Sequence, residues 1–230
     1  MTEEDQFAHE LEYFRHDAEA ASQYLYAYLA VHAAAAEDKA ILGLINRESL
    51  WWRTCLGALQ TSFFISLGRV FDRDSRSHSL RRLIQIALDN PHIFSKEALG
   101  RRSTVADFVK RAYEPRSADF KRIRTHVDKW RAVYASKYEP IRHKVFAHRD
   151  ASNTEPLWAS TQVRQMQQLL AFLRALHEAF WQLYNNGKKP VLRGGRYSVK
   201  GSKPPGKGVH DRIAIEAKRF LNRSASIPKG

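Results

Sequence analysis

Apolar side chains recur at every third or fourth position along most of this chain, which is the spacing of one face of an α-helix. Residues 7–36 show this spacing with acidic side chains early, where they suit the positive end of a helix dipole. Residues 39–71 are nearly apolar all round between positions 54 and 68, which predicts a helix at the centre of a bundle. Shorter stripes of the same period predict further helices at residues 80–89, 96–99, 103–113, 118–138 and 161–184.

Turn-forming residues separate these stripes. Asn90 and Pro91 stop the helix that begins at residue 80. Pro140 either kinks the helix before it or begins a new one, because its ring removes an interior hydrogen bond anywhere after the first turn. The pattern therefore predicts an all-α, bundle-like fold, with a helical domain over residues 1–187 and a basic linker or tail over residues 188–230 that holds a short helix.

The composition excludes several classes of protein. With 230 residues and 43% hydrophobic side chains, the chain can bury one sizeable core. The single cysteine, Cys55, rules out an internal disulfide and a zinc site built on paired cysteines, so we expect a reducing, cytoplasmic setting and no metal or other cofactor. The longest uncharged stretch, residues 20–36, includes polar side chains and is shorter than the roughly 20 apolar residues that span a bilayer.

The net charge of +14 is unevenly distributed. Residues 1–50 carry 10 acidic and 3 basic side chains, whereas residues 188–230 carry 12 basic and 2 acidic ones. A surface this positive attracts polyanions, so RNA is the first partner to expect, ahead of an anionic membrane surface. The tail is either an RNA-binding arm or a solubilising extension. Its RNA-binding candidates are Arg193, Arg196, Lys200, Lys203 and Lys207.

The densest cluster of ionisable side chains occupies residues 141–150, on or at the end of a helix. It holds the segment RHKVFAH, in which five residues separate Arg142 from His148, and an aspartate follows two positions after the histidine. The segment LGRVFD at residues 67–72 lies upstream, at the end of the central helix. On these segments the chain resembles the HEPN superfamily of all-helical proteins, and within it the abortive-infection U-type (AbiU2-like) branch associated with phage defence.

The resemblance implies a metal-independent endoribonuclease that acts as a homodimer, as a toxin or phage-defence effector with a neutralising antitoxin partner. In the family pattern Arg142 and His148 are the catalytic pair, and facing helices bring two copies of the motif together. The chain departs from the pattern at two positions. His143 stands where Asn or Asp is common, and Asp150 stands where some relatives carry a tyrosine that a partner nucleotidyltransferase modifies.

The residue types also suit RNA cleavage on chemical grounds. Attack by the 2′-hydroxyl needs a group that exchanges its proton and a cation that holds the phosphate charge. His148 and Arg142 supply these two groups. Six residues along a straight helix separate them by about 120° and about 9 Å, so one helix does not aim both at one phosphate. We therefore expect a composite site at a dimer interface, with His148 as general base or acid.

Five further side chains are expected to support this site. His143 affects how the motif arginine is oriented or how phosphate is held. Lys144 lies on nearly the same helical face as the motif histidine, and either holds phosphate or is a solvated lysine. Asp150 either accepts a hydrogen bond from the motif or begins a loop. Arg69 and Asp72 end the central helix, where we expect them to form a buried pair.

A non-catalytic interpretation stays open beside the nuclease. In it the motif arginine is structural, the motif histidine is satisfied at an interface, and the protein is an RNA-binding or partner-binding module. The basic tail then carries the affinity. RNA cleavage, or its absence, distinguishes the two.

Overall fold

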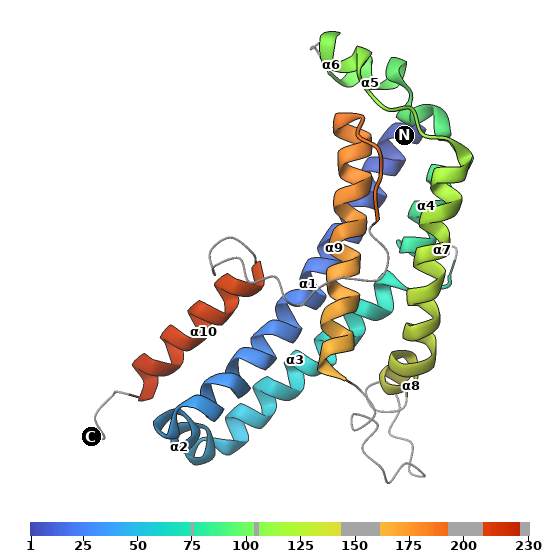
Figure 1. The fold of residues 1–230 in the computed structure, drawn as a ribbon. Helices are drawn as coiled ribbons and strands as arrows, with labels where there is room; N and C mark the ends of the chain where they lie inside the picture. The colour runs from blue at the N-terminus through green and yellow to red at the C-terminus, as the bar shows by residue number, and fades with distance from the viewer. Residues whose placement is uncertain (75, 104–105, 144–161, 193–208, 226–230) are drawn as a thin grey trace. The chain divides into compact units, whose positions relative to one another are not determined.

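The computed structural model describes residues 1–74, 76–103, 106–143, 162–192 and 209–225. Every regular element in these ranges is helical (Figure 1), which confirms the all-α fold that the apolar stripes predicted. No helix in these ranges is long and apolar enough to cross a membrane. In chain order the elements are α1 (Glu3–Glu37), α2 (Lys39–Arg47), α3 (Ser49–Val70), α4 (Leu80–Asp89), η1 (Pro91–Phe94), α5 (Lys96–Arg102), α6 (Ala106–Lys110), α7 (Ser117–Val133), η2 (Tyr134–Tyr138), α8 (Glu139–Ile141), α9 (Val163–Asn186) and α10 (Val209–Ala225).

The described residues form two compact units, each built from segments that are far apart in the sequence. Those within Met1–Ala18 and Leu67–Val199 make up the first unit, and those within Glu19–Ser66 and Lys200–Gly230 make up the second. Helices α1 and α3 contribute residues to both units. The part of the candidate site that the structure describes lies in the first unit.

Aromatic side chains form the core of the first unit. Phe7 of α1 is fully buried, and its ring centroid lies 4.9 Å from that of Phe94 in η1 and 5.8 Å from that of Phe180 in α9. Such edge-on pairs add about 0.5–1.5 kcal/mol each to the burial of the rings. These contacts hold the start of α1 against η1 and α9.

A buried carboxylate fixes the loop that follows α3. Glu10 of α1 is 3% exposed, and its Oε1 lies 2.9 Å from Nδ1 of His78 and 2.6 Å from Nε of Arg82. Ser79 between them caps α4, because its hydroxyl accepts a hydrogen bond from the Arg82 backbone N–H. A charge this deeply buried requires such partners, so the start of α4 is tied to α1.

Helix α10 is part of the second unit's core. Leu221 is 1% exposed and packs in one cluster with Val31, Ala34 and Ile41. Nζ of Lys218 also lies 2.7 Å from Oε2 of Glu37. The tail helix that the sequence predicted is thus 17 residues long and is anchored by a buried leucine.

Two predicted helices are broken or shortened by tertiary contacts. The helix expected at 39–71 is interrupted at Glu48, so that α2 and α3 both reach the cluster around Ile41. The helix expected at 103–113 ends as the short α6, because the Tyr113 backbone N–H donates to the Gly187 carbonyl at 2.6 Å instead of continuing the helix. Hydrophobic periodicity carries no information about either contact.

Candidate functional site

Arg142 lies shortly after a π-helical turn that directly follows α7. Residues Tyr134–Tyr138 form the π-helical turn η2, in which the Glu139 backbone N–H donates to the Tyr134 carbonyl five residues back. Helix α8 then begins with Pro140 in its first turn, where the missing N–H costs nothing. Because a π-turn inserts one extra residue, it rotates the following side chains by about 100°. The start of a new helix at this proline is one of the two outcomes that the sequence allowed.

Gly68 of α3 makes room for the Arg142 side chain. A Cβ atom at position 68 would overlap Nη1 of Arg142 and would lie 2.8 Å from its Cδ. The arginine therefore lies directly against the helix at a residue that has no side chain. This contact explains a glycine in the interior of an apolar helix, where alanine would be about 1 kcal/mol more favourable.

Arg142 is half-buried, and within the described chain the polar contact of its guanidinium is with the residue that follows it. Nη2 lies 3.0 Å from Nε2 of His143. A guanidinium can only donate, so Nε2 of His143 accepts in this contact. Among the described residues no carboxylate lies within ion-pair distance of Arg142, since Glu139 instead meets Arg73 at 2.9 Å. Arg142 therefore keeps a charge that no described side chain neutralises.

Tyr134 lies near enough to Arg142 for the arginine's charge to act on it. Its side chain is 3% exposed, and its ring stacks on Phe71 with 4.9 Å between centroids and 18° between planes. Its hydroxyl has no hydrogen-bond partner among the described residues. Burial raises the pKa of Tyr134 to about 12, although the nearby Arg142 charge acts in the opposite direction. The hydroxyl is therefore a neutral donor at the edge of the site.

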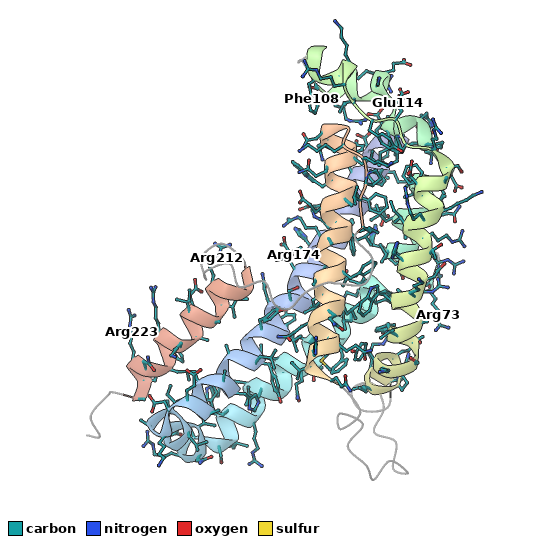
Figure 2. The ribbon with its side chains drawn as sticks, viewed as in Figure 1. Arg73, Phe108, Glu114, Arg174, Arg212 and Arg223 are labelled. Atoms are coloured by element: carbon teal, nitrogen blue, oxygen red, sulfur yellow. The ribbon has the colours of Figure 1, made fainter. Side chains whose placement is uncertain are left out.

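Arg73 and Glu139 border the site as an ion pair. Arg73, labelled in Figure 2, is exposed, and its Nη2 lies 2.9 Å from Oε2 of the less exposed Glu139 in α8. The pair joins the loop after α3 to the turn that carries the motif arginine. Sequence reasoning missed both residues and also Tyr134, because these side chains come together only in three dimensions.

The expected buried pair between Arg69 and Asp72 is not formed. The Arg69 side chain is 66% exposed, and its Nη1 lies 3.7 Å from Oδ1 of Asp17 in α1. Burial raises the pKa of Asp17 even though this arginine lies beside it. The Asp72 carboxylate accepts a hydrogen bond from the Asp74 backbone N–H at 3.0 Å. The predicted pairing is wrong because α3 ends at Val70, before a helical contact between positions 69 and 72 can form.

A hollow of about 180 Å³ adjoins the site where α3, α4 and α7 meet. Phe71 and Asp72 belong to its wall, together with the arginines at positions 81, 124 and 131. Its second carboxylate, Asp128, lies 3.9 Å from Arg124 and 3.8 Å from Arg131. The arginines outnumber the carboxylates, so this hollow favours anions.

Eight of the predicted site residues lie outside the described part of the chain. No geometry is assigned to Lys144, His148 and Asp150 of the motif, or to the tail residues Arg193, Arg196, Lys200, Lys203 and Lys207. Of the predicted residues that the structure does describe, Arg142 and His143 are brought together, whereas Arg69 turns toward α1. The described ranges contain no group of three His, Cys, Asp or Glu side chains that could hold a metal ion.

Comparison with known proteins agrees with the resemblance seen in the motif. No curated protein and no solved structure matches the chain. The family model HEPN AbiU2, described as AbiU2, matches residues 4–198, which is most of the sequence and spans nearly all of α1 through to the end of α9. The chain therefore belongs to the AbiU2 family of HEPN proteins.

Proposed function

We propose that this protein is a metal-independent endoribonuclease that acts as a toxin or phage-defence effector. One observation carries the proposal: Arg142, in the segment that resembles the HEPN motif, is half-buried, and no described carboxylate neutralises its guanidinium. A structural arginine at this depth would ordinarily be paired. An arginine that acts on phosphate needs its charge and its planar fork available.

The proposed reaction is attack of the RNA 2′-hydroxyl on the adjacent phosphorus. His148 takes the 2′-hydroxyl proton or delivers a proton to the departing 5′-oxygen. The 2′-oxygen forms a bond to phosphorus as the bond to the 5′-oxygen breaks, which yields a 2′,3′-cyclic phosphate and a free 5′-hydroxyl. Arg142 stabilises the negative charge on the non-bridging oxygens during this step.

We propose a homodimer, because on a straight helix the spacing of the two motif residues would not aim both side chains at one phosphate. We propose that each site takes Arg142 from one subunit and His148 from the other. The basic hollow beside Phe71 and Asp72 and the basic tail supply attraction for the rest of the RNA strand. A protein antitoxin that covers this site would neutralise it.

The direct test is to incubate purified protein with RNA in a chelator and to analyse the product ends. We expect cleavage that leaves 2′,3′-cyclic phosphate, and loss of that cleavage in His148→Ala. Cleavage that requires an added divalent cation, or 3′-hydroxyl products, contradicts the mechanism. Undiminished cleavage by His148→Ala contradicts the assignment of the histidine.

The alternative is a non-catalytic RNA-binding module, favoured by the concentration of positive charge in the tail. Deleting residues 188–230 is a poor test, because it also removes the buried Leu221 from the second unit's core. Changing Arg193, Arg196, Lys200, Lys203 and Lys207 to glutamine removes the charge alone.

The two functions give different results with this five-glutamine variant. For the nuclease we expect weaker RNA binding and persisting cleavage. The plot of log binding constant against log salt concentration should become shallower by about 0.7 for each phosphate that the tail no longer neutralises. For the binding module, RNA association is abolished and the wild type does not cleave.

A further inference from the structure

The Tyr134 hydroxyl differs from those of the other buried tyrosines that the structure describes. Tyr138, one helical turn later, donates to Oε1 of Gln165 at 3.4 Å, and Tyr184 donates to the Glu4 carbonyl at 3.2 Å. The Tyr134 hydroxyl is similarly buried and has no partner in the described part of the chain. Burying a hydroxyl without a partner lowers stability, and phenylalanine would fill the same space without that cost. A tyrosine at this position therefore calls for an acceptor that binds there.

The charges around this hydroxyl favour an anion as that acceptor. Arg142, Glu139, Asp72 and Arg73 are the charged groups close enough to act on it. Glu139 is already paired with Arg73, and Asp72 accepts from the backbone of its own loop. Arg142 is left with no carboxylate partner among the described side chains. A neutral donor without an acceptor and a cation without a carboxylate partner therefore lie near each other in the described part of the chain.

The ring and the guanidinium are both held in place from the side of α3. Phe71 stacks against the tyrosine ring, and Gly68, three residues earlier, lies against the arginine. Exposure rises from the buried Tyr134 through the half-buried Arg142 to the exposed His143. An oxyanion from solvent would therefore approach from the exposed side, beside His143.

We propose that Tyr134 and Arg142 of a single subunit form a phosphate-binding subsite, in which the Tyr134 hydroxyl donates to an oxygen of the phosphate that Arg142 holds. The ligand class is a tetrahedral phosphate oxyanion. That this phosphate is an RNA phosphodiester rests on the proposed nuclease function, whereas binding of the oxyanion does not. The hydroxyl stays protonated throughout the neutral range, so it donates without adding charge.

Tyr134→Phe in the full chain tests the subsite, with Tyr138→Phe as the matched control. Inorganic phosphate, compared with chloride at equal ionic strength, should raise the thermal midpoint of the wild type. Tyr134→Phe should lose that response, keep or raise the midpoint without phosphate, and lower kcat for RNA cleavage about 10- to 100-fold. Tyr138→Phe should lower the midpoint, because it loses a hydrogen bond to Gln165, yet keep the phosphate response and the kcat.

Each contrary result has a distinct meaning. No phosphate response in the wild type, or an unchanged one in Tyr134→Phe, overturns the subsite. A midpoint in Tyr134→Phe that falls as far as in Tyr138→Phe also overturns it, since the hydroxyl then has a structural partner. A wild type that binds phosphate through Tyr134 but cleaves no RNA keeps the subsite and removes the nuclease. Cleavage that is unaffected by Tyr134→Phe keeps the nuclease and removes the tyrosine from its site.

Discussion

Replacing Arg142 by alanine is expected to lower kcat for RNA cleavage about 100- to 1,000-fold, which corresponds to a loss of about 2.7–4 kcal/mol of transition-state stabilisation. RNA binding should change much less, because the proposed function assigns most of the affinity to charges spread over the hollow and the tail. Arg142→Lys should recover part of the rate, since lysine restores a charge but not the planar fork that holds two phosphate oxygens.

The loss of kcat in Arg142→Ala should occur without unfolding of the protein. Arg142 is paired with no described carboxylate, so its removal leaves no buried charge uncompensated. The thermal midpoint of Arg142→Ala should therefore stay close to that of the wild type. Arg174, exposed on α9 and labelled in Figure 2, is the matched control, and Arg174→Ala should leave cleavage unchanged. Equal cleavage by Arg142→Ala and wild type would remove the arginine from the mechanism.

Mixing two inactive variants tests the composite site. If each site takes Arg142 from one subunit and His148 from the other, a heterodimer of Arg142→Ala with His148→Ala contains one intact site and one doubly altered site. We expect the mixture, after subunit exchange, to recover cleavage that neither variant has alone. If both residues act within one subunit, each site in the heterodimer lacks one of them and no activity returns. Cleavage by a monomeric protein would also contradict the shared site.

The helices could be predicted from the sequence because burial follows a period of about 3.6 residues, and α9 shows how well this works. The stripe predicted over residues 161–184 includes Leu173, Leu176 and Phe180, which are all fully buried, and α9 ends at Asn186, close to the predicted end. The family could also be recognised in advance, because the segments that carry the resemblance are local patterns. In both cases the information lies within a short stretch of chain.

The surroundings of Arg142 could not be predicted in the same way. Gly68 and Arg142 meet across 74 positions of sequence, and the apolar period places Tyr134 on one side of a regular helix rather than in a π-turn. Local signals did exist. A proline six residues after the tyrosine indicates an irregular helix, and a glycine inside an apolar helix indicates a close approach. Neither signal says which distant residue makes the contact.

Gly68→Ala is expected to lower RNA cleavage about 100-fold, through a residue that takes no part in the chemistry. The added methyl group would occupy the space of the Arg142 guanidinium and displace it, and a misplacement of about 1 Å at a reacting centre costs on the order of 100-fold in rate. The atoms displaced are the far end of a flexible side chain, so the fold can accommodate the change. Stability should stay within about 1 kcal/mol of the wild type, because alanine is the better helix former.

Gly57 of the same helix provides the control for this substitution. A Cβ at position 57 meets nothing within 4 Å, so Gly57→Ala makes the same chemical change in open space. We expect it to raise the thermal midpoint slightly and to leave kcat unchanged, whereas Gly68→Ala loses kcat at a similar midpoint. In an Arg142→Ala background, Gly68→Ala should lower kcat no further, because the side chain that it displaces is already absent. An additive loss in the double variant would show that Gly68 acts on cleavage by some route other than the position of Arg142.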